Sequence, residues 1–261
     1  MFFEILIFFR NDVHFIRYFY FMMQAKKLPD WLNSRGIAML VDPDIGHPDS
    51  WERLSFMAKE CGVKLILVGG SFLHKDNLRS CILHCKKSGL PVWIFPGSGA
   101  QICAEADGVL LLSLLSGRNA EFLIGQHVLH ARALRDASLD FLPTAYILVD
   151  GGKPTTVSYI SNTVPIPMDK PHLAAATALA GEQLGMRLVY LDAGSGAQYA
   201  ISKEVIKAVS GECSLPLFVG GGIHSIEQIT DAWDGGAQWV VVGSKIEEDP
   251  QFLNELKRIT I

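Results

Sequence analysis

The sequence predicts a single (β/α)8 barrel of the TIM type. Eight short apolar runs lie between residues 37 and 242. Most of them are nearly continuous in hydrophobicity, which is typical of parallel strands buried on both faces. Longer stretches with the spacing of amphipathic helices separate most of these runs. Eight strands alternating with helices over roughly 225 residues match the size of one such barrel.

The predicted strands follow one another along the chain, and most end at a turn rich in Gly or Asp. They cover residues 37–41, 65–68, 92–95, 109–112, 146–149, 188–191, 217–219 and 239–242. The competing fold, an open doubly wound sheet, would need fewer strands and a phosphate-binding motif after the first of them. The sequence shows neither feature, which favours the closed barrel.

The predicted helices lie between these strands, at residues 50–61, 77–87, 120–137, 171–184, 202–209, 225–233 and 250–258. Residue types that favour helix starts support several of them. Asp49 and Ser50 stand at the start of the first helix. Pro171 and Ser202 stand at the starts of two later helices, as a first-turn residue and a cap respectively.

Two connections differ from the regular pattern. The link between residues 95 and 109 contains Pro96-Gly97-Ser98-Gly99 and is too short for a full crossover helix, so we expect an irregular segment in place of the third helix. Residues 151–167 form a long connection with prolines at 154, 165 and 167, which predict a loop without regular helix. This loop would lie at the catalytic end of the barrel.

The first 23 residues are predicted to be an N-terminal extension, with the barrel domain at residues 24–261. Charged residues interrupt this apolar stretch every few positions, so no run approaches the roughly 20 residues that a membrane-spanning helix needs. Met22 and Met23 directly precede the regular pattern, and either is a candidate start of the native protein. The alternative is an amphipathic anchor that contacts a membrane peripherally.

Composition excludes some classes of protein. The formal net charge is −4, with 23 basic and 27 acidic residues and no strong cluster of Lys and Arg, which argues against binding nucleic acid. Five cysteines without framework spacing indicate reduced thiols in a cytoplasmic protein. With 49% apolar residues the chain has ample material for a folded core.

Glycine-rich turns after three predicted strands indicate a phosphate site. They contain Gly194-Ser195-Gly196 after the sixth strand, Gly221-Gly222 after the seventh and Gly243-Ser244 after the eighth. In barrels of this kind, backbone N–H groups of such turns surround a phosphomonoester. Glycine lets the backbone approach the anion closely. The alternative is that these are merely the tight turns that any barrel requires.

Polar residues at other strand ends indicate further chemistry. Asp42 and Ser71 follow the first two strands, and their oxygens suit Mg²⁺, although Asp42 alone is equally compatible with a turn or cap. Asp44 is a second candidate ligand. Tyr190 and Asp192 share one side of the sixth strand. Asp192 would hold or deprotonate a substrate hydroxyl, or else cap the following turn.

Several motifs, in a fixed order, make this sequence resemble the geranylgeranylglyceryl phosphate synthase family, also called the PcrB-like or heptaprenylglyceryl phosphate synthase family. The resemblance covers about residue 24 to the C-terminus and is closest to the group that includes bacterial members. The most specific segments are residues 40–44, 68–71, 116–119, 185–197 and 219–223. Barrels of this family also lack their third helix, in agreement with the short third connection.

The resemblance implies a prenyl transfer. The 3-hydroxyl of sn-glycerol 1-phosphate would attack C1 of a polyprenyl diphosphate, with geranylgeranyl diphosphate as the expected donor, to give an ether. It implies Asp42 and Ser71 as ligands of Mg²⁺, and Tyr190 and Asp192 as candidate catalytic residues. The residues implied to hold glycerol 1-phosphate are Tyr190, Leu191, Asp192, Ala193, Gly194, Ser195, Gly196, Gly221, Gly222, Gly243 and Ser244. Members of the family usually self-associate, so a homo-oligomer is expected.

The sequence departs from the family pattern at two positions and leaves other functions open. Asp192 stands where the family usually has Glu, which retracts the charge by one methylene. Leu40 stands where some bacterial relatives have a phosphate-binding Lys, which places the chain in the other subgroup. A phosphosugar isomerase or aldolase, and a non-catalytic phosphate-binding barrel, are the alternative functions. An isomerase or aldolase would be expected to carry a catalytic Lys or a paired acid and base at strand ends. Asp42 and Asp192 are candidates for such a pair, but no strand-end Lys stands out.

Overall fold

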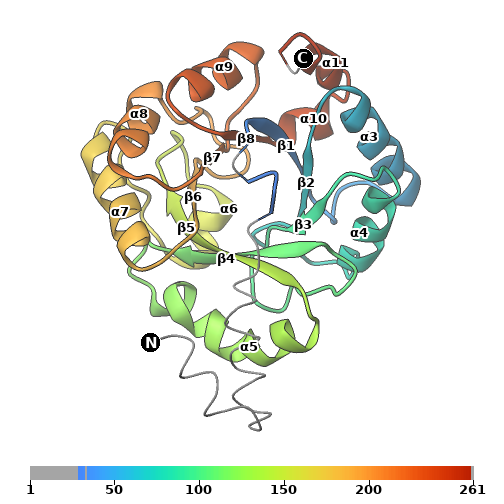
Figure 1. Cartoon of the computed structure of the whole chain (residues 1–261), viewed down its shortest axis with the longest axis horizontal. Coiled ribbons are helices and arrows are strands. Elements are labelled where there is room, and N and C mark those ends of the chain that lie inside the picture. The colour runs from blue at the N-terminus through green and yellow to red at the C-terminus, as the bar shows by residue number, and fades with distance from the viewer. Residues whose placement is uncertain (1–28, 33, 260–261) are drawn as a thin grey trace, which may run out of the picture. The chain divides into compact units, whose positions relative to one another are not determined.

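The computed structural model describes residues 29–32 and 34–259 (Figure 1). The chain divides into two units, Met1–Leu32 and Asn33–Ile261, and the second unit forms the barrel. The predicted N-terminal extension, residues 1–23, lies outside the described residues. Among the described residues, no helix combines the length and the apolar character needed to cross a membrane.

Eight parallel strands close into a barrel in sequence order, which confirms the predicted fold. The strands are β1 (Gly36–Val41), β2 (Leu65–Val68), β3 (Val92–Ile94), β4 (Gly108–Leu114), β5 (Asp140–Leu148), β6 (Leu188–Asp192), β7 (Leu217–Gly220) and β8 (Trp239–Val242). The barrel closes where β1 pairs with β8, with Gly36 opposite Trp239 and Met39 opposite Val242. The strands form the inner ring of Figure 1, and the longer helices lie outside it.

The helices between and after these strands follow most of the predicted positions. They are α3 (Pro48–Glu60), α4 (Leu78–Lys86), the π-helix η1 (Glu121–Gly125), α5 (Gln126–Asp136), α6 (Thr156–Ser161), α7 (Pro171–Gln183), α8 (Lys203–Glu212), α9 (Ile226–Asp234), α10 (Ser244–Glu248) and α11 (Phe252–Leu256). Pro171 opens α7 as predicted, and the Ser202 side chain caps α8 by accepting the Val205 amide. The first helix begins earlier than predicted, because Pro48 occupies its first turn.

The third connection carries no helix, as predicted, but the connection after β5 does. The prediction that residues 151–167 lack regular helix is wrong, because α6 occupies six residues between Pro154 and Pro165. A capping box of Thr155 and Ser158 starts this helix, and Asn162 in the left-handed conformation ends it. Prolines therefore limited the length of the helix without preventing it.

Alternate residues of each strand face opposite sides, which creates two apolar layers. One face packs under the helices, where the side chains of Ile37, Ile147 and Val219 belong to the main core cluster. The other face fills the barrel interior with large rings, and Phe218 stacks on Trp239 with centroids 5.5 Å apart. The interior is thus solid, and substrates have to bind at an end of the barrel.

Candidate active site

The three glycine-rich turns come together at the carboxyl ends of β6, β7 and β8. Gly194, Gly196, Gly221 and Gly222 all have φ between 68° and 88°, a conformation that favours glycine. A Cβ on Gly221 would lie 2.7 Å from the backbone nitrogen of Gly194, so the β6 and β7 turns are in direct backbone contact. Any side chain at Gly221 would therefore collide with the neighbouring turn.

The β8 turn joins the same group of backbone segments. The Ser195 and Ser244 hydroxyls lie 3.4 Å apart, which places the β6 and β8 turns beside each other. The side chains of Leu191 and Ala193 instead pack in the core between barrel and helices, so only their backbone groups face the cluster. The structure thus brings together all three segments that were predicted to hold a phosphate, and we call them the glycine cluster.

Asp192 ends β6 directly beneath the glycine cluster. One carboxylate oxygen, Oδ1, accepts the Gly194 amide at 2.7 Å, and the other, Oδ2, accepts the Tyr146 hydroxyl at 2.6 Å. Burial raises the pKa of Asp192, whereas the hydrogen bonds from Tyr146 and Gly194 lower it. Through the bond to Gly194, Asp192 caps the turn that follows β6. Asp192 is 7% exposed.

Tyr190 lies deeper, inside the barrel. Its ring stacks on Phe95 with centroids 4.9 Å apart and contacts Tyr146 edge-on. The missing side chain of Gly220 makes room for the Tyr190 hydroxyl, since a Cβ there would lie 2.5 Å from it. Burial raises the pKa of Tyr190 well above its ordinary value, and the nearby Asp192 raises it further.

Tyr146 was not among the residues predicted for the site. It lies opposite Tyr190 in the β5–β6 register and is 5% exposed. Its place in a predicted strand next to the sixth one was the available signal, because inward-facing residues of neighbouring strands adjoin. The position of the Asp192 carboxylate could not be foreseen from sequence, so neither could the hydrogen bond between them.

Asp42 directly follows β1, and Ser71 lies in the turn after the neighbouring strand β2. Asp42 Oδ1 accepts the Asp44 amide at 2.8 Å. The other oxygen, Oδ2, faces the turn that precedes Ser71, because a Cβ on Gly70 would lie 3.3 Å from it. Partial burial raises the pKa of Asp42, although the amide of Asp44 acts in the opposite direction. The structure thus places a carboxylate oxygen beside the Gly70–Ser71 turn.

Asp44, the second candidate ligand, is engaged elsewhere. Its carboxylate accepts the amides of His74 and Lys75 at 2.8 and 3.1 Å and pairs with the His74 ring at 2.7 Å. These bonds tie the loop after β1 to the loop after β2. Asp44 therefore fixes the relative position of the two loops that carry Asp42 and Ser71.

Glu247 is a second residue that sequence reasoning missed. It lies on α10, directly after the β8 turn, and its Oε1 accepts the Asp42 amide at 2.9 Å. Burial raises its pKa to about 7, and the nearby negative charge of Asp42 adds to this effect. The two residues are 205 positions apart, so no local pattern could have paired them.

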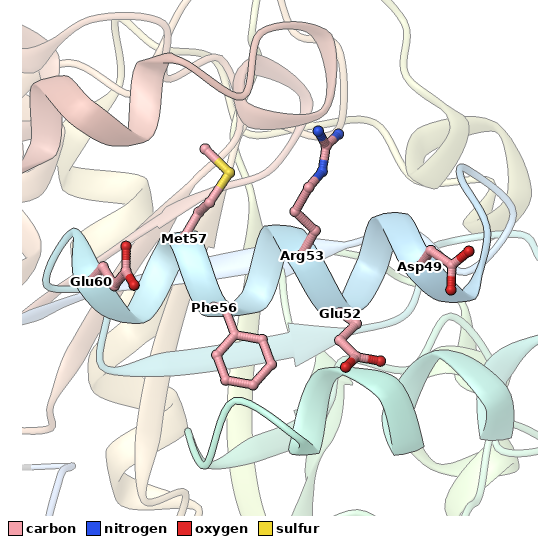
Figure 2. Close-up of a pocket in the computed structure, with 6 residues that line it drawn as sticks. All are labelled: Asp49, Glu52, Arg53, Phe56, Met57 and Glu60. Carbon is pink, nitrogen blue, oxygen red and sulfur yellow. The ribbon is translucent and has the colours of Figure 1, made fainter.

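An open groove of about 460 Å³ lies elsewhere, on the outer face of α3 (Figure 2). All the residues that line it belong to this one helix: Asp49, Glu52, Arg53, Phe56, Met57 and Glu60. None of them is a predicted site residue. Within residues 29–32 and 34–259, no three His, Cys, Asp or Glu side chains gather as a metal centre made by protein alone.

Comparison with known proteins matches this barrel to well-defined relatives. A family model described as "PcrB family" matches residues 29–260. A geranylgeranylglyceryl phosphate synthase from Spirosoma linguale is 46% identical over 86% of this chain and 91% of its own length. One from Pyrococcus abyssi is 40% identical over 85% of this chain and 87% of its own length.

A solved structure also covers the barrel. It is (S)-3-O-geranylgeranylglyceryl phosphate synthase from Thermoplasma acidophilum in complex with its substrate sn-glycerol-1-phosphate, which superposes with a TM-score of 0.82 at 32% identity. The match covers 87% of this chain and 92% of the other. Together with the family match over almost the whole described barrel, this shows that the chain belongs to the PcrB family.

Proposed function

We propose that this chain is a prenyltransferase that joins a polyprenyl diphosphate to the 3-hydroxyl of sn-glycerol 1-phosphate. The bond between C1 of the prenyl chain and the diphosphate oxygen breaks, and a bond from C1 to the glycerol oxygen forms. Diphosphate leaves, and the hydroxyl proton passes to a base. The observation that carries the proposal is the family match over residues 29–260, combined with a glycine cluster and an Asp42–Ser71 edge at one end of the barrel.

The glycine cluster would hold the phosphate of the acceptor. The backbone N–H groups of the cluster other than that of Gly194, which is bonded to Asp192, and the hydroxyls of Ser195 and Ser244 would be donors for a phosphomonoester, and the glycines would permit close approach. Asp192 adjoins this cluster, so its carboxylate would orient the glycerol and accept the hydroxyl proton. Tyr190 would shape the floor beneath it, since its ring packs inside the barrel.

Mg²⁺ would bind between Asp42 and Ser71, just beyond the carboxyl ends of β1 and β2. The residues fit the ion, because a carboxylate and a hydroxyl are hard oxygen donors, and Asp42 Oδ2 is directed toward the turn that carries Ser71. Two protein ligands suffice for Mg²⁺ when substrate phosphates and water complete its shell. When bound, the ion would neutralise charge on the leaving diphosphate.

The test is product formation from purified protein, Mg²⁺, sn-glycerol 1-phosphate and geranylgeranyl diphosphate, scored by mass. We expect the ether product from the wild-type chain and from Asp169→Asn, which changes an exposed carboxylate. Chelation with EDTA should abolish the product, and Asp42→Asn should lower the rate at least about 100-fold, because it removes the charge of the proposed ligand. Absence of product with every prenyl donor tried would overturn the proposal and favour an isomerase, aldolase or non-catalytic barrel.

Self-association and peripheral membrane contact remain predictions for this chain. Apolar side chains exposed on η1 and α5, Ile124, Val128 and Leu129, support an interface between copies. Light scattering of the purified protein should give a mass above that of one chain, and vesicle flotation would report the membrane contact. A monomeric mass across the micromolar range would contradict the predicted oligomer.

A further inference from the structure

We propose that Glu247 is a positioning residue that holds Asp42 and connects the two halves of the site. This inference rests on the proposed function, because it takes Asp42 as a ligand of the Mg²⁺ that would neutralise the leaving diphosphate. The glycine cluster lies at the ends of β6, β7 and β8, whereas Asp42 lies at the end of β1. Glu247 belongs to the helix after β8 and contacts the residue after β1, so it joins the two halves.

The contact is a hydrogen bond from the Asp42 amide to Glu247 Oε1 at 2.9 Å. Both ends of it are anchored. Glu247 stands three residues after Ser244 on α10, and the preceding Gly243 packs on Leu40, where a Cβ would lie 3.3 Å from the Leu40 Cβ. A displacement of the Ser244 turn would therefore be transmitted to Asp42 through a short helix and one bond.

The bond fixes the part of Asp42 that its side chain does not fix. The Asp44 amide already holds Oδ1, and the Ile45 amide donates to the Asp42 carbonyl at 3.1 Å, so the bond to Glu247 adds a partner for the remaining backbone group, the Asp42 amide. The other carboxylate oxygen, Oδ2, lies beside Gly70 and accepts no hydrogen bond from the described residues, so it can bind a ligand. A site residue held at both backbone and side chain is pre-organised for a metal with strict geometry.

The charge of Glu247 also suits this position. No Lys, Arg or His forms an ion pair with Glu247 in the part of the chain that the structure describes. The nearest basic residue on its own helix, Lys245, pairs with Asp249 at 3.3 Å instead. When Asp42 and Glu247 are ionised, they favour a bound cation over a bare diphosphate, because each negative charge lowers the free energy of a positive charge nearby.

The test uses the full chain with Glu247→Ala, Glu247→Gln and the matched control Glu248→Gln, which changes the exposed neighbour on the same helix. The measurements are the Mg²⁺ concentration for half-maximal rate, KM for each substrate, and binding of Mn²⁺ with inorganic diphosphate followed by electron paramagnetic resonance. A melting temperature reports folding of each variant.

Loss of the acceptor in Glu247→Ala should weaken Mn²⁺ binding and raise the half-maximal Mg²⁺ concentration about tenfold or more. Glu247→Gln should recover part of this loss, since its carbonyl oxygen can accept the Asp42 amide, and Glu248→Gln should match the wild type. Metal constants within twofold of wild type in both Glu247 variants would overturn the inference, as would a lowered melting temperature as the sole effect. If Glu247→Ala does not fold, Glu247→Gln and Glu247→Asp decide through the same constants.

Failure of the inference and failure of the proposed function are distinguishable. A wild-type chain that forms no ether product contradicts the function, whereas Mn²⁺ binding still compares the Glu247 variants. An active wild-type chain with unaltered Glu247 variants contradicts the positioning role alone.

Discussion

The Asp192 carboxylate is held by two donors, one from β5 and one from the turn after β6. The Gly194 amide reaches one oxygen and the Tyr146 hydroxyl reaches the other, so the charge has a fixed direction in a nearly buried place. Burial alone would favour the protonated acid, and the two donors oppose that effect. The side chain that the resemblance expects here, Glu, is longer by one methylene. The shorter acid is instead held close to its own turn.

Replacing Tyr146 with Phe should therefore make Asp192, the proposed base, a weaker acid. Tyr146→Phe removes the donor to Asp192 Oδ2, so the pKa of Asp192 should rise further above its ordinary value. The acidic limb of the pH profile of kcat/KM for glycerol phosphate should consequently move to higher pH, because more acid remains protonated at a given pH. Loss of a hydrogen bond to a charged group should also lower the free energy of unfolding by about 1.5–3 kcal/mol.

The matched control for this change is Tyr159→Phe, which removes the same hydroxyl from an exposed position on α6. Its pH profile and its urea midpoint should equal those of the wild type. An acidic limb that stays in place in Tyr146→Phe would mean that Asp192 does not take part in the proton transfer.

Among the elements, the third connection shows how a barrel positions a site without a helix. Gln101, which is 9% exposed, donates to the Gly70 carbonyl at 3.1 Å and accepts the Gly97 amide at 3.0 Å. Gly97 is needed because a Cβ there would lie 2.6 Å from the Ser71 carbonyl carbon. The irregular segment between β3 and β4 therefore packs against the Gly70–Ser71 turn and holds it by a hydrogen bond.

Gln101→Ala should cost both stability and metal affinity. The change leaves the Gly70 carbonyl and the Gly97 amide without their partner, which should lower the free energy of unfolding by about 1–3 kcal/mol in urea titrations. The half-maximal Mg²⁺ concentration should rise, because the Gly70–Ser71 turn loses its support. Gln101→Glu keeps the acceptor for Gly97 but turns a carboxylate oxygen toward the Gly70 carbonyl in a nearly buried place, so it should also lose stability at neutral pH. A Gln101→Ala variant as stable as the wild type would contradict the supporting role of Gln101.

The sequence sufficed for elements that depend on local pattern, and failed where distant residues decide. Eight apolar runs predicted all strands, and the short third link predicted a connection without a helix. The helix α6 was missed because prolines at its flanks were taken to exclude one, whereas Thr155 and Ser158 supply a capping box between them. Glycines at strand ends predicted the cluster, because each turn is local. The contacts of Tyr146 and Glu247 with the site could be found only in the folded structure, because their partners are distant in sequence.

At the scale of the whole molecule, barrel closure is what makes the site. β1 and β8 are at opposite ends of the sequence, yet Met39 lies opposite Val242 in their ladder. This pairing brings the turn after β8, with Gly243 and Ser244, beside the end of β1 and its Asp42. An open sheet of the same strands would leave these two turns at opposite edges. We therefore expect the proposed activity, as well as folding, to depend on the pairing of β1 with β8.

Gly36→Ala tests that seam. A Cβ on Gly36 would lie 2.8 Å from the ring of Trp239, which is fully buried and stacked on Phe218, so the indole has little freedom to move. Overpacking of this kind should lower the free energy of unfolding by roughly 1–3 kcal/mol, measured by urea denaturation. The control is Gly211→Ala on α8, where nothing lies within 4 Å of the new Cβ.

Gly211→Ala should raise stability by about 0.4–1 kcal/mol, because alanine reduces the entropy of the unfolded chain at no steric cost. If the free energy of unfolding falls in Gly36→Ala and rises in Gly211→Ala, the loss in Gly36→Ala comes from the clash with the Trp239 indole between β1 and β8. A Gly36→Ala variant as stable as the wild type would contradict this reasoning, because it would mean that Trp239 and its neighbours shift freely. In that case the packing of the barrel interior would not be rigid enough to fix the positions of the turns after β1 and β8.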